Sequence, residues 1–251
     1  MWAHCGVRGP EGGGNSSSVD TFGNQERLWD APDELRFDQA TRELVGAGFP
    51  LRYESAPAED SARVPAAPLV HPGGLRADEA QDFRLEVPTE LCRAPGDTVL
   101  TCLRDLDILD EPLQARIGIA PDVALLVQHG TIVGWSLTDP ARYLTATYAE
   151  PDTNPPSPAT RRLLTECLDL ITTPLLDEVR DWNPAALARL RALNEALRNQ
   201  REDGHRADAL ACAHQQLGRG QRRPDRSREP PACPAHGNDA DGGRHNAARI
   251  R

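Results

Sequence analysis

The chain has 251 residues, a length that fits one or two domains, and all 28 of its basic residues are arginine. The absence of lysine excludes pyridoxal enzymes, which need a Schiff-base lysine, and P-loop NTPases of the usual kind. The net charge of −10 is uneven, because residues 1–200 carry 18 Arg against 31 Asp and Glu, while residues 201–251 carry 10 against 7. An acidic body repels a phosphate backbone and an anionic membrane surface, so we expect neither nucleic acid nor a membrane as a partner.

The amino-terminal segment 1–25 is rich in Gly and Ser and has few large apolar side chains. It cannot bury enough apolar surface to offset the entropy of ordering, which predicts disorder. No apolar run follows Met1, so we expect no secretory signal. The six Cys are scattered along a chain that is not small, as is typical of reduced thiols. With the arginine-rich composition, these features favour a bacterial, cytoplasmic protein.

Residues 26–148 are expected to form an α+β body, which is small and mixed. Asp30 can cap exposed amides and Pro32 suits a first helical turn, and together they predict a helix over 32–45. A short strand is predicted at 49–53, confined to a sheet edge by its proline.

The rest of the body is predicted to alternate irregular and regular segments. The Pro- and Ala-rich stretch 55–80 is typical of a linker or a long surface excursion. Strict alternation over 83–87 predicts a half-buried strand, and apolar residues at helical spacing predict a helix over 98–109. Two β-branched runs that meet at His129, beside a glycine, predict a β-hairpin at about 122–137.

A helical hairpin is predicted at 159–200, where Asn183 and the proline after it mark the start of the second helix. An apolar stripe runs along both helices over residues 163–197. This stripe could bury itself against a protein partner or a second copy of the chain. The Arg-rich tail 201–251 has few large apolar groups, and we expect it to be disordered, with a frayed helical extension at its start.

The densest acidic cluster lies at residues 105–111. Its carboxylates Asp107, Asp110 and Glu111 are hard oxygen ligands of the kind that bind Mg²⁺ or Mn²⁺. The alternative is a solvated acidic end of a helix that binds no metal. His129 has no carboxylate or thiol partner that its spacing identifies, and polar residues are ordinary at the tip of a turn.

The tail contains ligand types that zinc accepts, namely Cys212, His214, Cys233 and His236. Their spacing matches no zinc finger, and the flanks offer almost nothing to pack around a metal. Arginines gather over residues 219–228 and could contact nucleic acid or an acidic partner, although no aromatic residue is interleaved to stack on bases. The alternative is a solvated tail.

The sequence therefore supports two functions. The favoured one is an interaction or regulatory module without catalytic activity, with no cofactor, no catalytic residue and a protein partner or a second copy on the 163–197 stripe. The alternative is a metal-dependent hydrolase or nuclease that uses the 105–111 cluster. Convergence of these carboxylates on a concave pocket would favour the enzyme, whereas carboxylates that fan out into solvent would favour the module.

Overall fold

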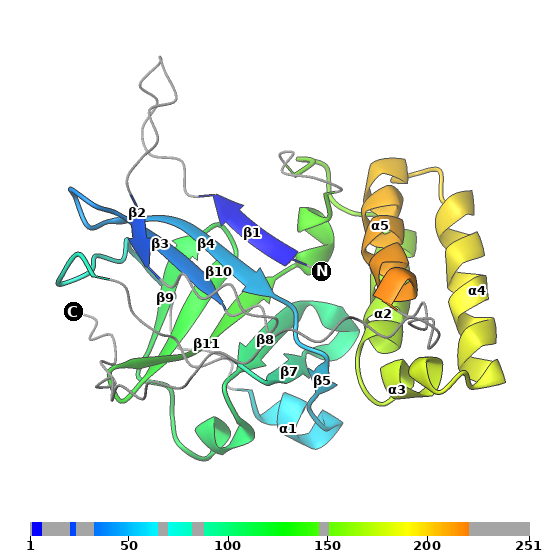
Figure 1. The fold of residues 1–251 in the computed structure, drawn as a ribbon, viewed down its shortest axis with the longest axis horizontal. Coiled ribbons are helices and arrows are strands. Elements are labelled where there is room, and N and C mark those ends of the chain that lie inside the picture. Colours follow the sequence, from blue (N-terminus) through cyan, green and yellow to red (C-terminus); the bar gives the residue numbers. More distant parts are fainter. Residues whose placement is uncertain are drawn as a thin grey trace, which may run out of the picture.

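The computed structural model describes residues 2–6, 21–23, 33–64, 70–81, 88–145 and 151–220. These residues form two β-sheets and a group of helices, which confirms the predicted α+β class. Figure 1 shows the sheets on one side of the molecule and the carboxyl-terminal helices gathered on the other. Within the described ranges, no helix has the length and apolar character that crossing a membrane requires.

The larger sheet has a β-hairpin near its centre. Its seven strands run in the order β5 (Glu54–Ser55), β7 (Glu90–Arg93), β8 (Val99–Leu103), β11 (Thr131–Thr138), β10 (Val123–Gln128), β9 (Ala115–Ala120) and β6 (Val70–Pro72). Neighbours are antiparallel except at the two edges, where β5–β7 and β6–β9 are parallel. The hairpin predicted at 122–137 is present as β10 and β11. His129 and Gly130 turn it with φ angles of 52° and 74°, the left-handed region that a tight hairpin turn requires.

The helix predicted over 98–109 is wrong, because these residues form strand β8 and a 3₁₀ helix, Leu106–Asp110. Strand β8 lies between β7 and β11, and both of its faces are covered. Leu100 and Cys102 face one hydrophobic cluster, whereas Leu103 faces the other. A strand buried on both faces has a nearly continuous apolar run, so the run does not alternate and resembles a buried helix.

The helix predicted over 32–45 is also wrong. This region forms part of a four-stranded sheet in the order β1 (Trp2–Gly6), β4 (Leu44–Pro50), β3 (Glu34–Asp38) and β2 (Thr21–Gly23). Leu35 and Phe37 point into the core, while Arg36 between them is exposed. This alternation of buried and exposed side chains has the two-residue period of a β-strand. The Asp38 carboxylate accepts hydrogen bonds from the amides of Ala40 and Thr41 at 2.9 and 2.7 Å, and this side-chain turn replaces the expected helix.

The predictions for four other segments are met only in part or cannot be compared with the described residues. In the segment 1–25, predicted to be disordered, the structure places β1 and β2, and the remaining residues lie outside the described ranges. The predicted linker 55–80 contains helix α1 (Ala58–Arg63) and strand β6. The strand predicted at 83–87 lies outside the described residues. Strand β4 ends at Pro50 and pairs on both sides, so the edge strand expected at 49–53 is instead the end of an internal strand.

The helical pair predicted at 159–200 is present in part, because three helices occupy this range, and they belong to a larger helical layer. Its helices are α2 (Pro158–Ile171), α3 (Leu175–Arg180), α4 (Pro184–Asn199) and α5 (Gly204–Gly220). Helix α5 corrects the expectation of a disordered tail from residue 201, although it agrees with the helical extension expected at the start of that tail. Ala207 and Leu210 are buried in the core, and Arg206 is fully buried, so this polar sequence packs as a helix. Residues 221–251 lie outside the described part of the chain.

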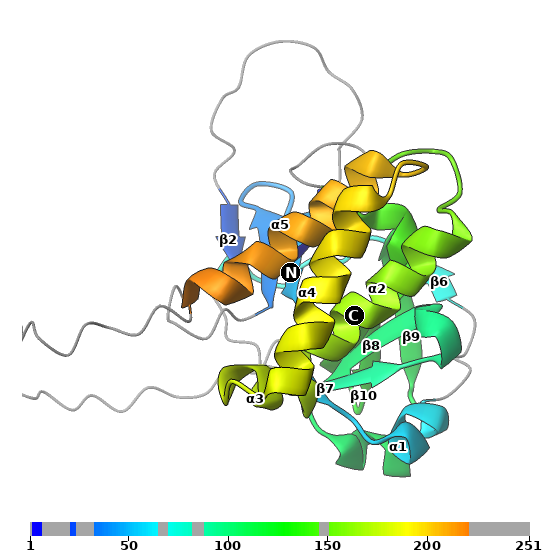
Figure 2. The same cartoon turned by 90° about the vertical axis from the view of Figure 1, so that its right-hand side faces the viewer.

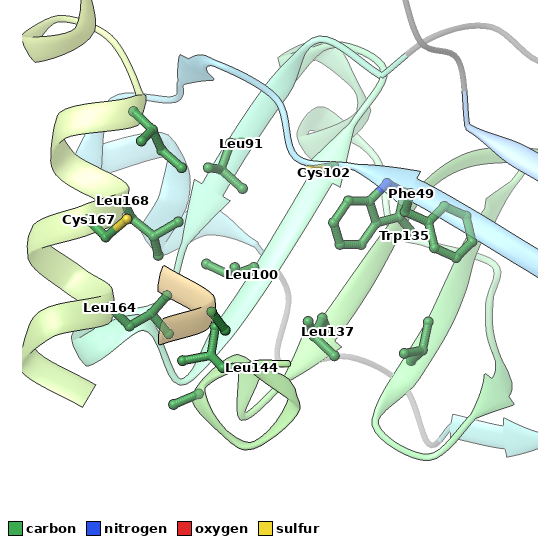
Figure 3. Close-up of a cluster of buried hydrophobic side chains, with 14 of the residues drawn as sticks. Phe49, Leu91, Leu100, Cys102, Trp135, Leu137, Leu144, Leu164, Cys167 and Leu168 are labelled. Carbon is green, nitrogen blue, oxygen red and sulfur yellow. The ribbon is translucent and has the colours of Figure 1, made fainter. Parts of the chain in front are cut away.

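A single row of buried residues crosses the larger sheet and organises the core. Leu91, Cys102, Trp135 and Leu125 occupy facing positions on β7, β8, β11 and β10. The Trp135 ring stacks on Phe49 of β4 at 5.3 Å between ring centroids, which joins the two sheets. Figure 3 shows this pair and, at the other end of the row, the α2 residues Leu164, Cys167 and Leu168 packed toward Leu91. Trp135 is therefore a core anchor.

Candidate functional site

The carboxylates of the 105–111 cluster do not meet at one point. Asp105 accepts a hydrogen bond from the Ile108 amide at 3.2 Å and caps the 3₁₀ helix. Asp110 pairs with Arg63 of α1, and its hydrogen bond helps to raise the pKa of that arginine. The Asp107 side chain is exposed. In the part of the chain that the structure describes, no three His, Cys, Asp or Glu residues gather into a group that could hold a metal ion.

The structure gives His129 a partner that the sequence did not reveal. Its Nε2 lies 2.7 Å from an oxygen of Glu111, a residue 18 positions away. The buried Gln128 amide donates to the carbonyls of Ile108 and Glu111 at 3.0 and 3.1 Å, and this holds the loop against the hairpin. An open hollow of about 570 Å³ lies beside the pair and is lined by Glu111, Pro112, Gln114, Gln128, His129 and Gly130. The imidazole and the carboxylate form an exposed hydrogen-bonded pair, and two ligands are fewer than a catalytic zinc needs.

Cys92, Cys102 and Cys167 are buried thiols. Burial raises the pKa of Cys92 to about 11 and that of Cys167 to about 12, and it raises the pKa of Cys102 further still. A thiol with so high a pKa is a poor nucleophile. Cys212 is exposed on α5, and His214 lies in the same helix. The other two tail candidates, Cys233 and His236, lie outside the described residues.

The apolar stripe predicted over 163–197 is packed inside the chain. Its α2 members contact the larger sheet, and its α4 members Leu193 and Leu197 are buried with α5 in the same cluster. Figure 2 shows α4 and α5 lying over α2. The buried side chains of the stripe therefore hold the helical layer together and are part of the core of this chain.

A partly buried ion cluster fastens this layer to the sheet. Arg93 of β7 makes a two-point pair with Asp97, at 2.7 and 2.9 Å, and reaches Asp169 of α2 at 2.8 Å. The Thr165 hydroxyl donates to Asp97, and Arg189 of α4 lies 3.5 Å from Asp169. Paired arginines of this kind give strong, oriented hydrogen bonds. The charged side chains of this cluster pair with one another and hold β7, α2 and α4 together.

A second buried cluster lies at the start of α2 and α5. The Asp203 carboxylate accepts hydrogen bonds from the Ser157 amide at 2.7 Å and the Thr160 hydroxyl at 2.6 Å. Arg206, fully buried, pairs with Asp203 at 3.1 Å and donates to the Asn154 carbonyl at 2.6 Å. Burial alone would raise the pKa of Asp203, but these hydrogen bonds and the charge of Arg206 lower it to about 2.

A third buried carboxylate lies between the two sheets. Asp33 is 6% exposed and accepts a hydrogen bond from Arg52 at 2.9 Å. Burial raises the pKa of Asp33 to about 6, against the opposing effect of the Arg52 charge. Perturbed carboxylates mark catalytic sites when they lie in a cleft. The paired Asp33 lies instead in the interior, beside the Cys102 thiol and the Trp135 ring.

The turn between α3 and α4 has an unusual residue at its strained position. The Trp182 amide donates to the Val179 carbonyl at 3.2 Å, and the Asn183 amide donates to the Glu178 carbonyl at 2.9 Å. These two bonds form a Schellman motif, in which the residue after the helix takes a left-handed conformation and is usually glycine. Here that residue is Trp182, with φ of 61°. Asn183 then caps α4 with its side chain, so α4 begins directly after the turn.

The side chain at this strained position points into solvent. Trp182 is 63% exposed, and Tyr53, before β5, is 48% exposed. The Arg180 guanidinium lies over the Tyr53 ring, 6.0 Å from its centroid. The carboxylates of Glu178 and Asp181 are exposed on the same turn. We refer to Tyr53, Glu178, Arg180, Asp181 and Trp182 as the turn surface.

The sequence pattern identified only a junction between two helices at Asn183, and it gave Trp182 no role. A large aromatic residue in a very short helix connection, directly before an Asn-Pro cap, is the signal that could have revealed it. Comparison with known proteins adds no identification, because the chain matches no family model, no curated protein and no solved structure.

Proposed function

We propose that the chain is an interaction or regulatory module without catalytic activity, and that its turn surface binds a protein partner. The observation that carries this proposal is the exposed Trp182 at a left-handed position. A left-handed backbone destabilises an L-residue by about 1–2 kcal/mol, and glycine avoids this penalty. The largest apolar side chain therefore occupies a site where a glycine would stabilise the fold more.

Packing within the chain does not explain this choice, since most of the indole is in solvent. Contact with another molecule would explain it. Tryptophan, tyrosine and arginine are the residues that most often dominate the energy of protein interfaces, and the turn surface contains one of each. Strain that persists at an exposed position is a reason to infer function there.

The proposal keeps the function expected from the sequence and changes the surface. Most apolar side chains of the 163–197 stripe are buried in the helical layer, while Leu187 and Leu190 are only partly buried, and this favours a partner site on another surface. The alternative, a metal-dependent hydrolase, has less support. Two of its three carboxylates, Asp110 and Glu111, are paired with Arg63 and His129.

A capture experiment with a matched control tests the proposal. The control is Val70, a large apolar residue outside the turn surface, which is 45% exposed on edge strand β6. Tagged wild type, Trp182→Gly and Val70→Ser proteins are incubated with extract of the source cells, and retained proteins are quantified by mass spectrometry. We expect a set of proteins that wild type and Val70→Ser retain and Trp182→Gly loses. The same set on all three proteins would overturn the proposal.

A further inference from the structure

The turn surface carries negative charge that its own helix does not neutralise. Arg180 is already paired with Asp177 at 3.3 Å. Glu178 and Asp181 are exposed and have no basic partner among the residues that the structure describes. An exposed indole beside free carboxylates matches the chemistry of a guanidinium group, which stacks on aromatic rings and binds carboxylates through two hydrogen bonds.

The chain itself carries a group of guanidinium side chains in the sequence that directly follows α5. Helix α5 ends at Gly220, and residues 221–228 follow it with four arginines, Arg222, Arg223, Arg226 and Arg228. In both Figure 1 and Figure 2, the carboxyl-terminal end of α5 lies toward the side of the helical layer that carries α3. Eight extended residues span up to about 26 Å, so the segment is long enough to reach a neighbouring helix.

We propose that residues 221–228 bind the turn surface of their own chain, with arginine side chains on Trp182 and on the carboxylates of Glu178 and Asp181. This inference rests on the proposed function and adds its regulation. The bound tail occupies the surface, and a partner protein must displace it. The tail therefore sets the affinity with which the module binds its partner.

Two observations favour the chain's own tail over a second copy. The whole chain has a net charge of −10, and copies of like charge repel one another. A short tether also gives the tail an effective concentration on the order of millimolar at the surface, far above the concentration of a second copy in dilute solution. Binding within one chain is thus favoured even when each contact is weak.

The test follows the indole Nε1–H of Trp182 by NMR in the full chain. Its cross-peak is assigned by its loss in Trp182→Phe. The test variant changes the four arginines 222, 223, 226 and 228 to Gln, and the control changes Arg244, Arg249 and Arg251 to Gln, which removes positive charge from a more distant part of the tail. We expect the cross-peak to move in the test variant and to keep its wild-type position in the control.

Salt and dilution complete the design. Raising NaCl from about 0.05 M to about 0.5 M should move the wild-type peak toward the position of the test variant, because exposed charge pairs are screened. One cross-peak position in all three proteins at low salt would overturn the proposal. A peak that moves on dilution of the wild type would also overturn it, since contact within one chain does not depend on concentration.

This result is separable from the capture experiment. If the tail does not bind, the cross-peak stays in place while Trp182→Gly still loses the partners that Val70→Ser retains. If the tail does bind, the four-arginine variant should also retain more of those partners than wild type. Retention that falls in this variant would contradict regulation by the tail.

Discussion

The helical layer contains two Asp–Arg pairs with the same spacing of three residues and nearly the same length. Asp203 and Arg206 lie 3.1 Å apart, and Asp177 and Arg180 lie 3.3 Å apart. The Arg206 side chain is fully buried, whereas the side chains of the second pair are more than half exposed. An exposed pair of this kind contributes little, because water screens it and both side chains lose freedom.

The two regions differ in what else the charges touch. Asp203 and Arg206 hold the loop before α2 and the start of α5 through backbone amides and carbonyls. At the α3–α4 turn, Arg180 lies over an exposed ring and Trp182 projects into solvent. The first region is satisfied by contacts within the fold, whereas the second combines a left-handed backbone with exposed side chains. This contrast supports the proposal that the turn surface binds a partner.

The largest expected effect comes from the buried pair. Asp203→Ala should destabilise the fold by about 3–5 kcal/mol, because it leaves Arg206 buried without its counter-ion. Asp177→Ala is the matched control, and it should change the free energy of unfolding by less than about 0.5 kcal/mol. Urea unfolding followed by circular dichroism measures both. Equal effects would remove the distinction between the two regions.

Asp203 should also make the stability of the fold depend on pH. Its pKa of about 2 in the folded state lies below the ordinary value of 3.8. The stabilisation is therefore present above the ordinary pKa and is lost as the pH falls toward 2.

Asp33 should respond to pH in the opposite direction. Its folded pKa of about 6 lies above the ordinary value of 3.8, so the folded state holds its proton more tightly than the unfolded state. Stability from this proton is present at low pH and is lost as the pH rises through 6. Between pH 4 and pH 7, wild type should lose about 2 kcal/mol relative to Asp33→Asn.

The control for that comparison is Asp38→Asn. Hydrogen bonds from Thr41 and Ala40 lower the pKa of Asp38, so wild type should gain rather than lose stability relative to this variant as the pH rises. Unfolding curves at the two pH values measure each difference. A pH-independent difference for Asp33→Asn would mean that Asp33 stays ionised in the folded chain.

Substitution of Trp182 in the turn surface should stabilise the fold slightly. Trp182→Gly should raise the free energy of unfolding by up to about 1 kcal/mol, because relief of the left-handed strain exceeds the added freedom of glycine in the unfolded chain. Trp182→Ala keeps the strain and should bring no such gain. A loss above about 1 kcal/mol in Trp182→Gly would make Trp182 a structural residue and would end the contrast between the two regions.

Local signals predicted part of the fold correctly. The β10–β11 hairpin follows from two β-branched runs at a glycine turn, and α4 follows from Asn183 and the proline behind it. Strand β8 could not be recognised, because both of its faces are buried and its apolar run does not alternate. The β3–β4 hairpin depends on the Asp38 side chain, which forms a turn inside a segment whose residues also suit a helix.

The candidate sites were harder to predict than the fold, because they depend on contacts between distant segments. Glu111 meets His129 only because the loop that carries it is fixed by Gln128. Tyr53 reaches Arg180 across more than a hundred residues of sequence. The exposure of Trp182 depends on how α3 and α4 pack, and no local pattern contains that information.

The smallest expected effect concerns metal, and it separates the two functions derived from the sequence. A working Mg²⁺ or Mn²⁺ site gathers oxygen ligands, so binding stabilises the fold, by about 2.7 kcal/mol at a hundredfold excess over the dissociation constant. Asp110 faces Arg63 and Glu111 faces His129, and a cation would have to displace both partners. We therefore expect the same melting temperature with and without millimolar Mg²⁺ or Mn²⁺. The variant with Asp107→Asn, Asp110→Asn and Glu111→Gln should behave as wild type does in this assay. A saturable rise in melting temperature that this variant abolishes would favour the hydrolase over the interaction module, and a rise that survives it would direct attention to Cys212 and the rest of the tail.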